Sequence, residues 1–199
     1  MRRHVVSIFG VFVALFLLAG PVTAASTPDG FIRTVGDKAF LSLGENGLSE
    51  KERTKRFRDL LNEAFDLPRI GRFVLGRYWR VATDEQRAEY LALFEKFVIQ
   101  AYVNRFQDLT DKKLNVIRAN ELSGKETLVL SEIEIPGKPP VNVNWKVRNM
   151  DSGFKIVDVT VEGVSMSITQ RDEFAAVIKQ SGGKIDGLIR ALRKKTSDD

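Results

Sequence analysis

The spacing of apolar residues divides the chain into a helical part followed by a strand-rich part. Through the first half, apolar side chains recur every three or four residues, which is the period of an amphipathic helix. Helices are predicted near 28–43, from Ser49 onward, from Asp66-Leu67-Pro68 onward, and from Thr83 to about Leu109. Thr83 and Gln86 have the spacing of a capping box, and the helix that they open carries a wide, aromatic apolar face.

The period changes to two after the long helix. Four strands are predicted, over 114–122, 127–135, 141–150 and 154–166, and short turns rich in Gly, Pro, Ser and Asp separate them. Such short connections imply an antiparallel meander. Two further helices are predicted near 169–180 and 184–195, on either side of a Gly-Gly pair.

The last two strands differ in their alternation. In 141–150, Val141, Val143 and Trp145 alternate strictly with polar residues. In 154–166, Phe154 and Ile156 occupy one phase, whereas Val157, Val159 and Val161 occupy the other. We therefore expect the last strand to be apolar on both faces and covered on both sides.

These elements predict one α+β domain, because the helices and the strands form separate runs along the chain. The expected architecture is an antiparallel, curved four-stranded sheet covered by helices (NTF2-like), with an apolar pocket between the sheet and the helices.

The first residues have the three-part pattern of a signal peptide. Arg2, Arg3 and His4 are followed by an apolar run to Gly20, and small residues stand around Ala24. The run is shorter than the ~20 residues of a membrane-spanning helix. We expect residues 1–24 to be cleaved, leaving 25–199 as a single domain in the periplasm.

Composition narrows the possible chemistry. The sequence has no Cys, and its one histidine, His4, lies in the predicted signal peptide. The processed chain therefore lacks the residues of a Ser-His-Asp triad, a Cys-His pair or an ordinary zinc site. The formal charge of +5 falls to about +3 without Arg2 and Arg3, an excess that favours anionic lipid surfaces or acidic partners. No metal or cofactor is predicted, nor any nucleic-acid partner.

Two local patterns could carry chemistry. Gly71 and Gly76 have the spacing of a phosphate-binding loop, but Arg77-Tyr78 stands where that loop requires Lys-Ser or Lys-Thr. Asp158 interrupts an apolar strand. It is interpreted as a structural acceptor for backbone N–H groups or an arginine, and the alternative is a general base.

Two longer motifs resemble those of a known family. The first is FVLGRYWRVAT at 73–83, followed by Glu85-Gln86-Arg87, and the second is VDVTVEGVSM at 157–166, followed by 171–174. Both resemble the signatures of the MlaC family, also called the Tgt2 or toluene-tolerance auxiliary family. The resemblance covers roughly residues 48–192. Within it, residues 168–171 and the pair Gly182-Gly183 are also similar to the hopanoid-associated HpnM branch.

The resemblance implies a non-enzymatic carrier, the soluble component of an ABC-type lipid transport system that shuttles phospholipid between the outer and inner membranes. It implies transient contacts with an MlaA-like outer-membrane lipoprotein and an MlaD-like inner-membrane transporter complex. The candidate lipid-binding residues are Phe73, Val74, Tyr78, Trp79, Phe94, Phe97, Val98, Tyr102, Val141, Val143, Trp145, Val157, Val159, Val164 and Met166.

Three alternatives stay open at this point. One is a carrier for hopanoids or other polycyclic lipids. Another is an NTF2-like enzyme that uses Asp158 as its base. The third is a protein-interaction module without a lipid ligand. Periodicity does not separate them, because a core and a lipid cavity both require apolar inward faces.

Overall fold

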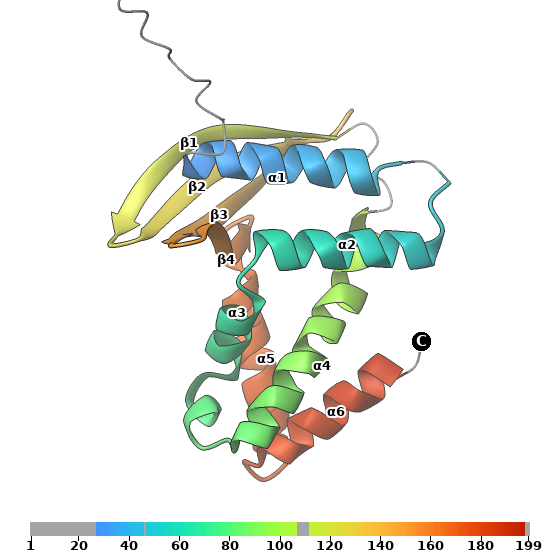
Figure 1. Cartoon of the computed structure of the whole chain (residues 1–199), viewed down its shortest axis with the longest axis vertical. Helices are drawn as coiled ribbons and strands as arrows, with labels where there is room; N and C mark the ends of the chain where they lie inside the picture. Colours follow the sequence, from blue (N-terminus) through green and yellow to red (C-terminus); the bar gives the residue numbers. More distant parts are fainter. Residues whose placement is uncertain (1–26, 46, 107–111, 198–199) are drawn as a thin grey trace, which may run out of the picture.

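A computed structural model describes residues 27–45, 47–106 and 112–197. A curved sheet with helix α1 across it forms one end, and helices α3–α6 form the other (Figure 1). The helices are α1 (Pro28–Leu43), α2 (Glu50–Ala64), α3 (Leu67–Leu75), the 3-10 turn η2 (Gly76–Arg80), α4 (Asp84–Tyr102), the 3-10 turn η3 (Val103–Phe106), α5 (Met166–Gln180) and α6 (Ile185–Ser197).

The strands form one antiparallel sheet in the order β1-β2-β3-β4-β5. They are β1 (Lys113–Ser123), β2 (Glu126–Glu134), β3 (Val141–Met150), β4 (Gly153–Val161) and β5 (Val164–Ser165). The predicted α+β class and antiparallel meander are confirmed. The sheet has five strands instead of four, because the predicted last strand turns back on itself.

That turn lies at Glu162-Gly163. Both residues have positive φ, at 47° and 81°, which reverses the chain so that Val164 pairs with Val161. The carboxylate of Glu162 accepts a hydrogen bond of 2.5 Å from the backbone N–H of Asn142. This bond ties the turn to the start of β3. Met166, predicted to end the strand, instead begins α5.

Side-chain caps set the starts of the helices as the sequence indicated. Thr83 and Gln86 form the predicted capping box at the start of α4, and the Ser49 hydroxyl accepts from the N–H of Glu52 at the start of α2. Asp66 caps α3 through the N–H of Arg69. The long helix was predicted to reach Leu109, but the α-helix ends at Tyr102 and the chain continues as the 3-10 turn η3 to Phe106. The last predicted residues, 107–109, lie outside the described residues.

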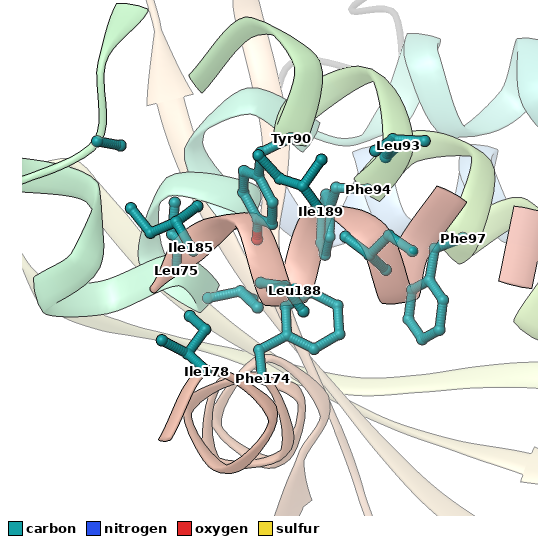
Figure 2. Packing of buried hydrophobic residues seen from close by; sticks show 13 residues of the cluster. Leu75, Tyr90, Leu93, Phe94, Phe97, Phe174, Ile178, Ile185, Leu188 and Ile189 are labelled. Atoms are coloured by element: carbon teal, nitrogen blue, oxygen red, sulfur yellow. The ribbon is translucent and has the colours of Figure 1, made fainter. Parts of the chain in front are cut away.

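The apolar interior consists of three clusters. The sheet cluster joins Val116, Val129, Val147 and Ile156 to α1 and the end of α2. A second cluster joins α1, α2 and the end of α4. The third, called the helical cluster below, is built from α3, α4, α5 and α6 (Figure 2). Phe65, at the end of α2, packs against both of the first two clusters.

Helices of membrane-spanning length and apolarity are not found within the ranges that the structure describes.

Candidate lipid-binding site

One face of the sheet carries most of the predicted strand residues. Trp145 pairs with Val159, and Val143 pairs with Val161, so their side chains lie on the same side of the sheet. Val141 shares this side at the start of β3. We call it the inner face, because Val129, Val147 and Ile156 on the same side pack against α1 and α2. Val143 is buried, whereas Trp145 and Val159 are half-buried.

A β-bulge in β4 places most apolar side chains of that strand on the inner face. Val147 pairs with Ile156, but Lys146 pairs with Asp158, which leaves Val157 as an extra residue without a partner on β3. The bulge shifts the alternation, so that Ile156 and Val159 lie on the same face. The expectation of a strand apolar on both faces is therefore wrong, and the change of phase in the sequence was the signal of the bulge.

Trp145 is held in place by a buried serine. Its indole N–H donates to Ser131 Oγ at 2.9 Å, and the same hydroxyl donates to the carbonyl of Val143 at 2.5 Å. Ser131 is only 1% exposed. Both polar groups are thereby satisfied within an apolar face. Ser131 was not among the residues selected from the sequence.

Tyr102 and Met166 lie together where the helices meet the sheet. The Tyr102 hydroxyl lies 4.0 Å from Met166 Sδ, which joins the end of α4 to the start of α5. Both side chains are half-buried. Val164, just before α5, is 52% exposed, so it does not contribute to an interior wall in this structure.

The aromatic face of α4 packs elsewhere. Phe94 and Phe97 contact Phe174 of α5, with ring centroids 6.3 and 5.5 Å apart, and Val74 belongs to the same cluster (Figure 2). These rings pack among helices α3 to α6, and among the residues that the structure describes the helical cluster contains none from the sheet. Val98 packs against both the helical cluster and the α1–α2–α4 cluster, so it lies between the two.

The two sequence signatures meet at the end of α3. The guanidinium of Arg171 lies over the Phe73 ring, 5.2 Å from its centroid. Gly76 adopts φ 59°, ψ −129°, and a Cβ there would lie 2.9 Å from Arg171 Nε. Tyr78 and Trp79 pack against the helical cluster, whereas Phe73 is 42% exposed. This contact between α3 and α5 was not predicted from the sequence.

Asp158 is a structural acceptor in this arrangement. One carboxylate oxygen accepts from the N–H groups of Val159 and Ser167 and from the Ser167 hydroxyl, at 2.9, 3.1 and 2.7 Å. The other accepts from the Ser165 hydroxyl at 2.7 Å. Ser165 is also the N-cap of α5. The carboxylate therefore fastens β4 to the first turn of α5, and both of its oxygens already accept hydrogen bonds from this turn or from β4.

Tyr90 closes the helical cluster from within. Its side chain is fully buried, and its hydroxyl donates to the carbonyl of Gly71 at 3.0 Å. Burial raises the pKa of the Tyr90 hydroxyl, so the group stays protonated as a donor.

Two surface depressions flank the sheet. One, of about 440 Å³, is lined mainly by residues on the side of the sheet opposite the inner face, called the outer face, including Arg118, Leu130, Asn142 and Asn144. The other, of about 380 Å³, lies where the α2–α3 junction meets the β3–β4 turn, and its lining includes Phe65, Leu67, Met150 and Lys155. The second depression opens beside Phe65, on which two apolar clusters converge.

Known proteins share both the sequence pattern and the fold. The family model described as MlaC protein matches residues 33–194. The intermembrane phospholipid transport system binding protein MlaC of Haemophilus influenzae is 22% identical, over 92% of this chain and 88% of its own length. The toluene tolerance protein ttg2D of Pseudomonas putida is 24% identical, over 90% and 86%.

A solved structure has the same fold. It is the phospholipid-binding protein from Ralstonia solanacearum in complex with a phospholipid, which superimposes with a TM-score of 0.74 at 20% identity. The alignment covers 85% of this chain and 96% of that one. Together with the family match over most of its length, the two signatures place this chain in the MlaC family.

Proposed function

We propose that this chain is a phospholipid carrier, not an enzyme, that holds acyl chains between the inner face of the sheet and the adjoining helices. The observation that carries the proposal is membership of the MlaC family. The fold shared with a protein that was solved with a bound phospholipid supports it.

The inner face offers a suitable wall. Val143, Trp145 and Val159 form a continuous apolar strip, and the polar groups within it are already hydrogen-bonded to each other. Acyl chains make no hydrogen bonds, so they require a surface of this kind. Tyr102 and Met166 stand at its helical border.

The energetics explain why a carrier is needed. Burying one methylene is worth ~0.8 kcal/mol, so two acyl chains with roughly 30 methylenes represent on the order of 20 kcal/mol. Free passage of a phospholipid through water is therefore prohibitively slow. An apolar slot removes this cost without any catalytic residue.

The cellular setting is part of the same proposal. The signal-peptide pattern supports export to the periplasm. There the carrier exchanges lipid with an MlaD-like inner-membrane transporter complex and an MlaA-like outer-membrane lipoprotein. The name of the Haemophilus relative, a binding protein of an intermembrane phospholipid transport system, supports membership of such a system.

Two tryptophans allow a sharp test of the acyl-chain site. The sequence contains only Trp79 and Trp145, so the Trp79→Phe variant reports on the inner face alone and the Trp145→Phe variant on the α3–η2 region alone. The processed protein is incubated with phospholipid carrying brominated acyl chains, which quench indole fluorescence at short range. Strong quenching of Trp145 with little quenching of Trp79 is expected. Equal emission with brominated and ordinary lipid in the Trp79→Phe variant would disprove the assignment.

The identity of the cargo needs a second measurement. Native mass spectrometry of protein purified from the periplasm should show a bound phospholipid mass. A bound mass that matches a hopanoid would show that the cargo is a polycyclic lipid instead of a phospholipid. Protein without any bound lipid would favour an interaction module.

A further inference from the structure

Arginine side chains gather over aromatic rings around the turn η2. Arg77 lies 5.0 Å from the ring centroid of Tyr78, and Arg171 lies 5.2 Å from that of Phe73. Trp79 has two guanidinium neighbours, Arg72 at 5.8 Å and Arg87 at 5.4 Å. Stacking of this kind fixes a guanidinium in place. Arg77 also donates one N–H to the Tyr78 hydroxyl at 3.0 Å, which leaves its other N–H groups to meet an external acceptor.

Three of these charges are not neutralised by neighbouring carboxylates. Within the described ranges, no Asp or Glu lies at ion-pair distance from Arg72, Arg77 or Arg171. Arg87 differs, because it pairs with Asp84 at 2.9 Å. The positive charge around η2 is thus available to an external anion.

Exposed apolar side chains lie among these arginines. Phe73 is 42% exposed beneath Arg171, and Ile168 is 53% exposed. Ile168 and Arg171 are three residues apart on α5, so they share one face of that helix. The surface formed by Arg72, Phe73, Arg77, Ile168 and Arg171, called the arginine–aromatic surface below, therefore combines fixed cations with exposed apolar groups.

We propose that the arginine–aromatic surface docks the protein on the anionic headgroups of a membrane. Guanidinium groups bind phosphate through paired N–H donors. Exposed Phe and Ile side chains match the apolar boundary just below the headgroups. An acidic protein partner would satisfy the arginines equally well, but it would leave the exposed Phe73 and Ile168 without a matching environment. The combination favours a bilayer surface.

This docking surface is distinct from the proposed acyl-chain site. Phe73 and Arg171 lie on the α3–α5 side of the molecule, whereas Trp145 and Val159 lie on the inner face of the sheet. The protein holds acyl chains at the inner face, and it contacts the membrane through the arginine–aromatic surface when lipid is exchanged. Either proposal stands if the other fails.

Vesicle flotation tests the docking. The processed full-length chain is mixed with vesicles of phosphatidylcholine alone, or with about one third phosphatidylglycerol, at low and at high salt. Binding is expected only to the anionic vesicles, and it should weaken with salt because exposed charges are screened over ~10 Å at 0.1 M. The double variant Arg77→Glu/Arg171→Glu should bind at least about tenfold more weakly, since each basic residue near an anionic surface contributes severalfold.

Matched variants separate location from net charge. Arg58→Glu/Arg118→Glu makes the same change of charge on exposed positions of α2 and β1, and it should bind like the unchanged protein. Ile168→Ser keeps every charge and should weaken binding a few-fold. Circular dichroism establishes that each variant is folded. The salt dependence of vesicle binding is measured on the unchanged protein, so that part of the test does not depend on the folding of any variant.

Three outcomes would overturn the proposal. They are equal binding to neutral and anionic vesicles, equal losses in the two double variants, and no vesicle binding by the unchanged protein. The last result would point to an acidic protein as the partner of this surface. Quenching of Trp145 by brominated lipid in the Trp79→Phe variant is measured in parallel, so failure of docking is not confused with failure of lipid binding.

Discussion

The two ends of the molecule are built from similar apolar residues but packed in different ways. In the helical cluster, Tyr90, Phe94 and Phe174 are almost fully buried and contact one another ring to ring. On the inner face of the sheet, Trp145 and Val159 stay half-buried. The helical end is thus a closed core, whereas the inner face of the sheet leaves part of its apolar surface exposed.

Burial separates the side chains whose contacts stabilise the fold from those that a ligand can still cover. A ring enclosed on all sides contributes its full burial energy to folding. A half-buried apolar side chain contributes less, but it can be covered by an acyl chain without breaking existing contacts. The candidate lipid-binding residues therefore include both enclosed rings of the helical cluster, such as Phe94, and half-buried side chains of the inner face, such as Trp145.

The greatest loss of stability is expected from a change in the helical cluster. Phe174→Ala removes the ring that contacts Tyr90, Phe94 and Phe97, and it leaves a cavity among α4, α5 and α6. We expect the free energy of unfolding to fall by about 3–5 kcal/mol. Urea denaturation measures it.

Phe174→Leu serves as its control, because it keeps most of the volume and should cost clearly less. Folded protein of either variant should still show quenching of Trp145 by brominated lipid. Loss of that quenching in folded Phe174→Ala protein would mean that the helical cluster is part of the lipid site after all.

A smaller effect is expected where the two signatures touch. Gly76→Ala forces a side chain into a backbone conformation that favours glycine and places its Cβ 2.9 Å from Arg171 Nε. The expected loss of unfolding free energy is about 2–3 kcal/mol. Thermal and urea unfolding provide the measurement.

Gly137→Ala separates the two causes. Gly137 also has positive φ, at 72°, but nothing lies within 4 Å of its Cβ position, so only the backbone cost of about 1–2 kcal/mol applies. Equal losses at the two glycines would show that Arg171 moves away freely, and that the contact between the signatures is loose.

Much of the fold could be predicted because it is encoded locally. Pro28, Ser49 and Thr83 mark helix starts through backbone and capping chemistry that needs no tertiary context. Alternation predicted which side of β3 is apolar. These are properties of neighbouring residues, so the sequence alone carries them.

The remaining features depend on contacts between distant segments. The bulge at Val157 changes the face of every later residue in β4, and strict alternation does not allow for it. The pairing of Phe94 with Phe174 depends on how α4 and α5 cross. Ser131 becomes a buried partner only because β3 brings Trp145 beside it.

The smallest change in stability should accompany the largest change in lipid binding. Val159 and Thr160 are neighbours on β4, both half-buried, on opposite faces: Val159 pairs with Trp145 on the inner face, and Thr160 pairs with Asn144 on the outer face. Val159→Gln places an amide on the apolar strip beside Trp145. Because the position is only half-buried, we expect a loss of about 1 kcal/mol in unfolding free energy.

Lipid retention should fall far more than stability does. An acyl chain that covers this part of the inner face would remove water from the new amide without offering it a hydrogen bond. Thr160→Gln introduces the same side chain one residue away and should leave retention unchanged. Retention is measured as bound phospholipid per protein after gel filtration. Equal retention by the two folded variants would place the acyl chains elsewhere, and the half-buried strip would then be an ordinary edge of the core.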